Sequence, residues 1–231
     1  MNILIVGTGA MGTSLANEIL KTQHTFATTD TCKNVAGSFD VIIDFSHHSN
    51  IGNICSFATE HNIAVVIGTT GYSQEQFEQI ELLSKKVPVV YSANYSVGIV
   101  LLKRIAASVA KTLANDFDIE IIEKHHNQKA DAPSGTATML LNAIDEQKNF
   151  SPIYGRKGSN KRTKNEIGIH SIRGGSIIGE HTVLFAGQAQ SLTITHQAHN
   201  KSIFATGAIQ AATWVIEKKA GLYNMEDVLG V

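Results

Sequence analysis

MNILIVGTGAMG, residues Met1 to Gly12, joins a short apolar run to a glycine-rich loop. The run ILIV has the continuous apolar, mostly β-branched composition of a strand buried on both faces of a parallel sheet. Apolar side chains then recur at helical spacing, at Met11, Leu15 and Ile19. Strand, glycine turn and helix in this order indicate the start of a Rossmann-like dinucleotide-binding domain.

The glycine loop fits the pattern G-x-G-x-x-G. In such loops the first glycine permits a tight turn, the second lets the backbone approach a pyrophosphate, and the third lets helix and strand pack closely. The N-terminus of the following helix favours the phosphate anion. A purely structural glycine turn is the alternative. The pattern predicts a cofactor-binding loop made of Gly7, Thr8, Gly9, Ala10, Met11 and Gly12.

An acidic residue follows the loop at the spacing that ribose recognition requires. Asp30 lies 18 residues after Gly12, near the end of the second predicted strand at residues 25–29. A carboxylate there accepts hydrogen bonds from the ribose hydroxyls of NAD. Lys33 and neighbouring threonines leave room for the extra phosphate of NADP. We therefore expect NADH, NADPH or both as cofactor, with a solvated loop aspartate as the alternative reading of Asp30.

Further strands are predicted at residues 41–45, 64–67 and 87–91, with a helix at 73–84. This alternation is typical of a doubly wound sheet, in which ligands bind beyond the carboxyl ends of the strands. Ordinary turn chemistry would also explain the small and hydroxyl side chains found in these loops. We expect contacts to the nicotinamide and its ribose from Gly68, Thr69, Thr70, Ser92, Ala93, Asn94 and Tyr95.

The pattern changes after residue 96. An amphipathic helix is predicted at residues 97–114, and the strands that follow alternate as in a mixed or antiparallel sheet. A polar, basic tract at residues 155–166 is predicted to be a mobile, solvated loop. A last helix from residue 204 is expected to return to the first domain. The predicted fold class is α/β, with a Rossmann-like domain of residues 1–96 and 204–231 and an inserted α+β domain of residues 97–203.

EKHHNQKADAPSGTA, residues Glu123 to Ala137, gathers groups that move protons and bind anions. Histidine titrates near neutral pH, and burial can depress the pKa of a lysine. A helix is predicted to begin around Ser134, where backbone N–H groups and the helix dipole favour a carboxylate. A plain N-cap is the alternative for Ser134. The stretch predicts a site for a dianionic substrate with a proton donor, formed by His125, His126, Lys129, Ser134, Gly135 and Thr136.

No metal site is expected in this stretch. Adjacent histidines on a strand point to opposite faces, and no cysteine lies nearby. Arg173, in the sequence RGG, is expected to be a solvated surface charge rather than a substrate contact.

Composition limits the partners and the location of the chain. Its net charge of -1 argues against affinity for nucleic acid or anionic membranes. No apolar run approaches the roughly 20 residues of a membrane helix, and the N-terminus lacks the basic region of a secretory signal. Two cysteines, Cys32 and Cys55, are too few for a disulfide framework. We expect a cytoplasmic protein that acts on a small molecule.

Several motifs together resemble the 4-hydroxy-tetrahydrodipicolinate reductase family, also called dihydrodipicolinate reductase. They are the glycine loop, the stretch from Glu123 to Ala137, GTTG at residues 68–71, SANYSVG at residues 92–98 and HSIRGGSIIGEHTV at residues 170–183. The resemblance implies that a hydride passes from NADH or NADPH to the ring of a heterocyclic dicarboxylate in the diaminopimelate and lysine pathway, with loss of water.

The same resemblance implies roles for single residues. His125 would donate or accept a proton, Lys129 would donate one, and His126 with Gly135 and Thr136 would bind the substrate. A homotetramer built through the sheet of the inserted domain is also implied. The glycine loop is one residue shorter than the form common in the family, which leaves the choice between NADH and NADPH open.

Two other functions are compatible with parts of the sequence. Another nicotinamide-dependent reductase of an amino-acid-derived acid would keep the glycine loop but would not need the histidine pair beside a carboxylate site. A non-enzymatic redox sensor would bind NADH without turnover, and it would normally carry a DNA-binding element that this nearly neutral chain lacks.

Overall fold

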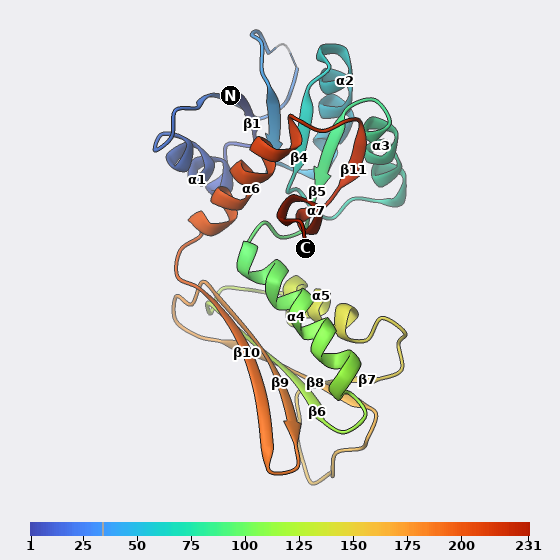
Figure 1. The fold of residues 1–231 in the computed structure, drawn as a ribbon. Helices are drawn as coiled ribbons and strands as arrows, with labels where there is room; N and C mark the ends of the chain where they lie inside the picture. The colour runs from blue at the N-terminus through green and yellow to red at the C-terminus, as the bar shows by residue number, and fades with distance from the viewer. Residues whose placement is uncertain (34) are drawn as a thin grey trace. The chain divides into compact units, whose positions relative to one another are not determined.

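The computed structural model describes residues 1–33 and 35–231 and divides them into two compact units (Figure 1). Unit 1 comprises Met1–Val97 and Lys201–Val231, and unit 2 comprises Gly98–Asn200. Unit 1 is thus formed from both ends of the chain, while unit 2 is one continuous segment.

Unit 1 contains a parallel sheet of six strands in the order β11-β5-β4-β3-β1-β2. The central strands are fully apolar and buried because helices cover both faces of the sheet. Strand β3 is the exception, since it ends in the buried acidic residue Asp44. The strands are β1 (Asn2–Val6), β2 (Thr25–Thr29), β3 (Val41–Asp44), β4 (Ala64–Ile67), β5 (Pro88–Tyr91) and β11 (Gly221–Tyr223).

The helices of unit 1 form two layers, α1 with α6 and α2 with α3 (Figure 1). Helix α6 packs on β3, β4 and β5, so the returning C-terminal segment covers one face of the sheet. The helices are α1 (Ala10–Ile19), α2 (Ile51–His61), α3 (Gln74–Ser84), α6 (Ser202–Val215) and α7 (Met225–Leu229), with a 3₁₀ turn η1 at His48–Asn50.

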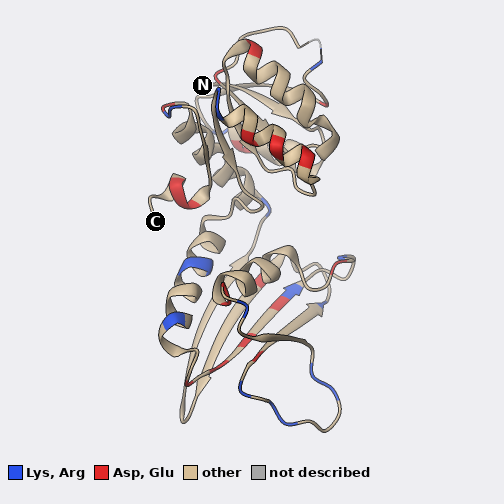
Figure 2. Ribbon diagram, turned by 90° about the vertical axis from the view of Figure 1, so that its right-hand side faces the viewer, with Lys and Arg blue, Asp and Glu red and all other residues tan. Residues whose placement is uncertain are grey.

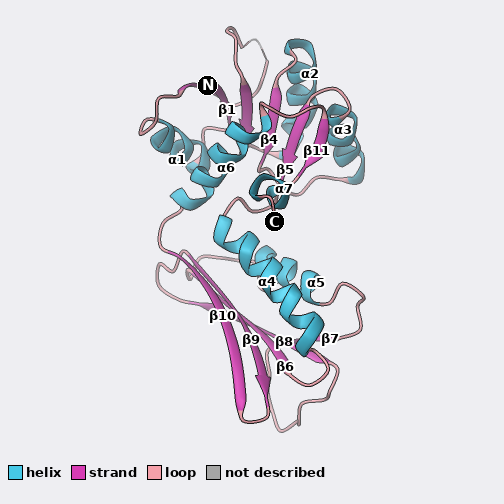
Figure 3. Cartoon of the chain, viewed as in Figure 1, coloured by secondary structure: helices cyan, strands magenta, loops and turns pink. Residues whose placement is uncertain are grey.

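Unit 2 contains a mixed sheet of five strands in the order β10-β9-β6-β8-β7. The central strand β6 pairs in parallel with β8 and antiparallel with β9, as the prediction of a mixed sheet allowed. Two helices lie on one face of this sheet (Figure 3). The elements are α4 (Val97–Leu113), β6 (Asp118–His125), α5 (Gly135–Ile144), β7 (Ser151–Tyr154), β8 (Glu166–Arg173), β9 (Gly179–Gly187) and β10 (Gln190–Ala198).

Strand β6 alternates strictly between its two faces. Ile119, Ile121, Glu123 and His125 are buried toward the helices, and the residues between them are more exposed on the other face. A glutamate and a histidine therefore lie on the same buried face, two residues apart.

The basic tract between β7 and β8 forms a loop that is rich in Lys and Arg (Figure 2). The prediction that its charges are solvated is wrong for two arginines. Arg162 Nη1 lies 2.7 Å from Glu120 Oε1, and Arg156 Nη1 lies 2.8 Å from Glu166 Oε2. The sequence could not show this, because Glu120 is brought to the loop only by the pairing of β6 with β8.

Across residues 1–33 and 35–231, no helix is long and apolar enough to cross a membrane.

Candidate active site

The glycine loop has the geometry that a dinucleotide requires. Gly7 has φ +110°, a conformation that residues with a Cβ avoid, and a Cβ at Gly12 would lie 1.8 Å from the carbonyl oxygen of Gly7. A Cβ at Gly9 would meet no atom within 4 Å. The first and third glycines are therefore required by the turn and by the packing of α1, while the second leaves open space where a pyrophosphate can approach.

Asp30 lies beside this loop. The Thr8 hydroxyl donates a hydrogen bond to Asp30 Oδ1 at 2.5 Å, and the Gly7 N–H donates to the Thr29 carbonyl at 2.8 Å. Asp30 itself is exposed. Its carboxylate therefore stands at the end of β2 next to the N-terminus of α1, where it can accept bonds from a ribose.

A second group of predicted residues lines a cavity of 270 Å³ at the carboxyl edge of the parallel sheet. Four residues of this lining, Phe45 to His48, were not predicted as ligand contacts. Below them the buried Asp44 accepts hydrogen bonds from the hydroxyls of Ser46 (2.5 Å) and Tyr72 (3.3 Å), and burial raises the pKa of the Asp44 carboxyl. The lining residues are Met11, Phe45, Ser46, His47, His48, Gly68, Thr69 and Thr70.

The segment Ser92 to Tyr95 contains one residue, Tyr95, whose side chain does not suit the predicted contact with the cofactor. Tyr95 is 2% exposed, and its hydroxyl donates to the Ile67 carbonyl at 2.8 Å. The Ser92 hydroxyl donates to the Asn94 carbonyl at 2.8 Å. The aromatic side chain of Tyr95 is therefore part of the core of unit 1.

In unit 2, the buried carboxylate of Glu123 accepts hydrogen bonds from His125, Arg173 and Ser134. Its Oε2 accepts from His125 Nδ1 at 2.5 Å and from Arg173 Nη1 at 2.9 Å. Its Oε1 accepts from Arg173 Nη2 at 2.7 Å and from the Ser134 N–H at 3.1 Å. Glu123 is 0% exposed, so these bonds replace its hydration.

The electrostatics of this group follow from these contacts. Burial opposes ionisation of Glu123, but hydrogen bonds from Arg173, Ser171, His125 and Ser134 outweigh it and lower its pKa to about 2. Burial lowers the pKa of His125, partly offset by Glu123. A neutral His125 that donates from Nδ1 to the carboxylate keeps Nε2 as a hydrogen-bond acceptor.

Ser134 is the N-cap of α5, as the simpler alternative for this residue proposed. Its Oγ accepts from the Ala137 N–H at 3.2 Å and lies 3.1 Å from His181 Nε2. Ser134 is 2% exposed, whereas Gly135 at the first position of α5 is exposed. Any ligand at this helix end therefore meets the backbone of its first turn rather than the Ser134 hydroxyl.

His181 lies behind the predicted catalytic histidine. The two rings are 5.1 Å apart in an edge-to-face arrangement. Burial, with a smaller contribution from His125, lowers the pKa of His181 to about 4, so His181 is neutral at physiological pH.

Lys129 and His126 belong to the turn between β6 and α5. The Lys129 N–H donates to the His126 carbonyl at 3.2 Å, and Lys129 Nζ lies 2.7 Å from Asp131 Oδ1. The Lys129 side chain is 24% exposed and that of Asp131 is 57% exposed, so the ammonium group can be reached by a ligand.

Arg173 corrects one prediction. It is not a solvated charge, because its guanidinium binds both oxygens of Glu123 and donates to the Asp131 carbonyl at 2.6 Å. The parallel pairing of β6 with β8 places Arg173 opposite His125. Glu123, Arg173 and His181 were not predicted as site residues. The signals available were the spacing of two between Glu123 and His125 on a strand, and the position of Arg173 and His181 within the family motif at residues 170–183.

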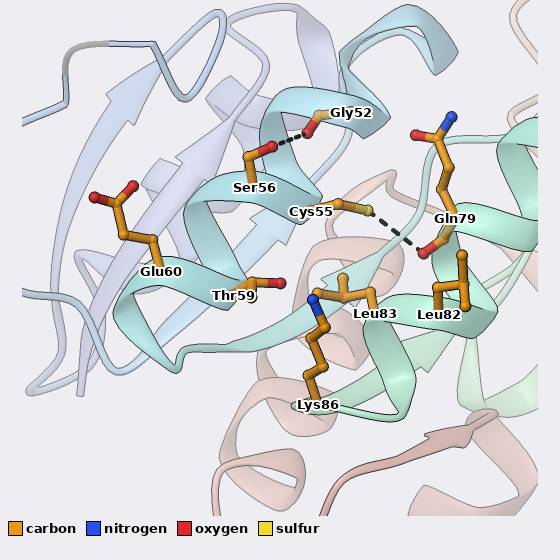
Figure 4. Close-up of a pocket in the computed structure, with 9 residues that line it drawn as sticks. All are labelled: Gly52, Cys55, Ser56, Thr59, Glu60, Gln79, Leu82, Leu83 and Lys86. Atoms are coloured by element: carbon orange, nitrogen blue, oxygen red, sulfur yellow. Dashed lines mark hydrogen bonds between the residues drawn. The ribbon is translucent and has the colours of Figure 1, made fainter.

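A larger groove of 540 Å³ lies between α2 and α3 (Figure 4). Two of its polar side chains are engaged locally, since the Ser56 hydroxyl donates to the Gly52 carbonyl at 2.9 Å and Cys55 Sγ to the Gln79 carbonyl at 3.7 Å. Burial raises the pKa of the Cys55 thiol to about 11, so it is a poor nucleophile. We therefore do not place the candidate active site in this groove, but at the residues described in the preceding paragraphs.

No cluster of three or more His, Cys, Asp or Glu side chains suited to a metal ion occurs in the described part of the chain.

Comparison with known proteins identifies the family. Family models described as dihydrodipicolinate reductase match both parts of the chain, the N-terminus model at residues 20–95 and the C-terminus model at residues 98–229. The chain belongs to the dihydrodipicolinate reductase family. In this family the N-terminal domain binds NADH or NADPH, so the chain is an NAD(P)H-dependent oxidoreductase and the sensor hypothesis is disfavoured.

Relatives in the family cover nearly the whole chain. The 4-hydroxy-tetrahydrodipicolinate reductase of Clostridium tetani is 48% identical over 82% of this chain and 75% of its own length. That of Brachyspira hyodysenteriae is 42% identical over 99% of this chain and 100% of its own length. A dipicolinate-bound dihydrodipicolinate reductase from Paenisporosarcina sp. TG-14 has a similar structure, with a TM-score of 0.80, 26% identity and 98% coverage of each chain.

Proposed function

We propose that this chain is a 4-hydroxy-tetrahydrodipicolinate reductase of diaminopimelate and lysine biosynthesis, with His125 and Lys129 as its proton-transferring residues. The observation that carries the proposal is the arrangement in unit 2, in which a neutral histidine, an accessible lysine and the start of α5 lie in one short stretch. Family membership and the names of the relatives support the reaction.

The cofactor residues fit a nicotinamide dinucleotide. The loop from Gly7 to Gly12 would hold the pyrophosphate at the N-terminus of α1, since Gly9 leaves space for it. Asp30 would accept bonds from the adenosine ribose, and the cavity lined by Gly68 to Thr70 would take the nicotinamide end. When bound, NADH or NADPH supplies the hydride.

The substrate residues fit a dicarboxylate. The first turn of α5, at Gly135 and Thr136, favours one carboxylate, because the positive end of the helix dipole lies there. Lys129 and His126, on the preceding turn, favour the second. The similar structure from Paenisporosarcina holds dipicolinate, which is an aromatic dicarboxylate, and this supports the same class of ligand.

The chemistry requires proton movement in two directions. The net reaction takes up one hydride and one proton and releases one water, so a proton must reach the departing hydroxyl and another must move at a ring carbon. Lys129 carries protons at Nζ and would donate to the hydroxyl. His125, with Nε2 as acceptor, would take the ring proton and return it to the reduced ring.

The test measures the loss of NADH or NADPH absorbance with freshly generated substrate. We expect His125→Gln and Lys129→Ala each to lower kcat by about 100-fold or more, because a positioned acid or base contributes that much, with cofactor affinity unchanged. Lys164→Ala, on the exposed basic loop, is the matched control and should keep the wild-type rate. Absence of turnover with either cofactor, despite cofactor binding, would overturn the proposal and favour the sensor.

We further propose that the chain assembles as a homotetramer through the face of the unit 2 sheet opposite α4 and α5. Ile172, on that face of β8, is 45% exposed. Ile172→Glu should shift the mass measured by light scattering toward smaller species. Ile105→Glu, at a 46% exposed position on α4, is the control and should not. A monomeric wild type would contradict this assembly.

The cytoplasmic location and the absence of nucleic-acid or membrane partners stay predictions, supported by the net charge of -1 and by the free thiols Cys32 and Cys55.

A further inference from the structure

We propose that Glu123 and Arg173 form a positioning pair that fixes the orientation of His125, selects Nε2 as its reactive nitrogen and ties the ring to the start of α5. This inference deepens the proposed function and rests on the catalytic role given there to His125. Neither residue needs to touch the substrate for this role.

The first support is that one buried carboxylate joins three elements. Glu123 and His125 lie on the same face of β6, Arg173 is the last residue of β8, and Ser134 caps α5. Glu123 Oε2 binds His125 Nδ1 at 2.5 Å, and Oε1 binds the Ser134 N–H at 3.1 Å. A shift of the carboxylate would therefore move the imidazole and the anion-binding helix end together.

The second support is that the guanidinium fixes the carboxylate itself. Arg173 binds both oxygens of Glu123, at 2.7 and 2.9 Å, and this bidentate geometry leaves the carboxylate plane little freedom. The guanidinium is held in turn by the carbonyls of Asp131 (2.6 Å) and Ile172 (2.8 Å). The chain beyond it is also anchored, since the Gly174 N–H donates to the His125 carbonyl at 2.9 Å.

The third support is the charge balance around His125. Burial lowers the pKa of His125, and the Glu123 carboxylate raises it. Arg173 pairs with that carboxylate and also opposes protonation of the ring, so Glu123 can orient His125 without keeping it protonated. The other charged or titratable groups that face His125 are His181 from β9 and Lys129 from the following turn, and Lys129 is itself paired with Asp131.

The fourth support is the packing around the reactive nitrogen. A Cβ at Gly179 would lie 3.3 Å from His125 Nε2. The edge of the ring that carries Nε2 therefore passes a residue without a side chain, whereas the edge that carries Nδ1 is fully engaged by Glu123.

The test is an NMR titration of His125 in protein labelled at the histidine rings, together with steady-state kinetics. Glu123→Gln removes the negative charge and should lower the pKa of His125. Arg173→Gln leaves Glu123 unbalanced and should raise it, with each shift about 1 pH unit or more. Both variants should lower kcat about tenfold or more, with KM for the cofactor unchanged.

Two variants act as controls. Arg173→Lys keeps the positive charge but loses the bidentate hydrogen bonds to Glu123. The pKa of His125 should therefore stay closer to the wild-type value than in Arg173→Gln, while kcat still falls. Arg162→Gln removes an arginine that pairs with Glu120 on the opposite face of the same strand, and it should leave the His125 titration unchanged. Circular dichroism checks that each variant is folded.

Two results would overturn the positioning pair. One is a shift of the His125 pKa in the same direction in Glu123→Gln and Arg173→Gln. The other is a His125 titration in Arg173→Gln that matches the one in Arg162→Gln. The titration requires no turnover. If the wild type lacks reductase activity but the shifts are opposite, the proposed function fails and the pair stands. If the wild type is active and the pKa shifts of His125 are absent, the proposed function stands and the positioning pair fails. If Glu123→Gln does not fold, the comparison of Arg173→Lys with Arg173→Gln still tests the pair.

Discussion

Ser134→Ala should destabilise unit 2 by more than the loss of an ordinary helix cap. The Ser134 hydroxyl accepts from the Ala137 N–H at 3.2 Å and lies 3.1 Å from His181 Nε2, and Ser134 is only 2% exposed. Removing an N-cap hydroxyl costs about 1 kcal/mol. Leaving a buried polar group such as His181 Nε2 without its partner costs about 1–3 kcal/mol more. We expect a loss of about 2–4 kcal/mol in the free energy of unfolding.

Ser73→Ala is the matched control for this measurement. Ser73 caps α3 in the same way, accepting from the Gln76 N–H at 3.3 Å, but it is exposed and has no buried histidine behind it. Its loss should cost about 1 kcal/mol. Both variants are compared by urea unfolding with circular dichroism, while fluorescence of the lone Trp214 follows unit 1 separately. If Ser134→Ala is no more destabilising than Ser73→Ala, the Ser134–His181 contact contributes nothing and the reasoning is refuted.

Three further outcomes are expected. Asp30→Asn should raise KM for NADH about tenfold and KM for NADPH by less, since it removes a ribose acceptor and also the repulsion between Asp30 and the 2'-phosphate of NADPH. Equal increases of the two KM values in initial-rate assays would contradict this. Gly9→Ala should keep the wild-type Tm but weaken NADH binding about tenfold or more. Gly12→Ala should lower both the Tm and the affinity for NADH, because only the Cβ added at Gly12 meets backbone, at 1.8 Å from the Gly7 oxygen. The His181 pKa falls from 6.5 in the unfolded chain to about 4 in the fold, so the unfolded state binds the extra proton. The free energy of unfolding is therefore unaffected by the protonation of His181 above pH 6.5 and falls as the pH drops toward 4, by at most about 1.4 kcal/mol per pH unit. His181→Gln should make the free energy of unfolding, measured by urea titration, depend less on pH in this range.

The sequence predicted most of unit 1 because burial on both faces leaves a clear pattern. The strands at 25–29 and 64–67 and the start of the helix at 97 lie where they were predicted. Two strands were not predicted, β7 (Ser151–Tyr154) and β11 (Gly221–Tyr223). Strand β7 contains a proline and is largely exposed at an edge, and β11 has three residues, so neither has enough alternation to be recognised.

The residues predicted for the unit 2 site are neighbours in sequence. His125, Lys129 and the start of α5 come from one stretch, and simple chemistry singles them out. Arg173 lies 50 residues from Glu123, and His181 lies 47 from Ser134, so their contacts depend on which strands of the mixed sheet pair and in what register. No local pattern contains that register.

The two ends of the chain meet in unit 1, and this sets an order of events on the ribosome. Unit 2 is continuous and can close its sheet once residue 198 has emerged. The parallel sheet of unit 1 must wait for α6, which covers it, and for β11, which pairs with the open edge of β5. A nascent chain therefore carries an unfinished first domain, with an exposed edge strand and apolar face, until β11 has been made. Premature termination anywhere before Tyr223 would leave that edge exposed for aggregation or proteolysis, even though most of the residues proposed to bind the cofactor and the substrate would already have been synthesised.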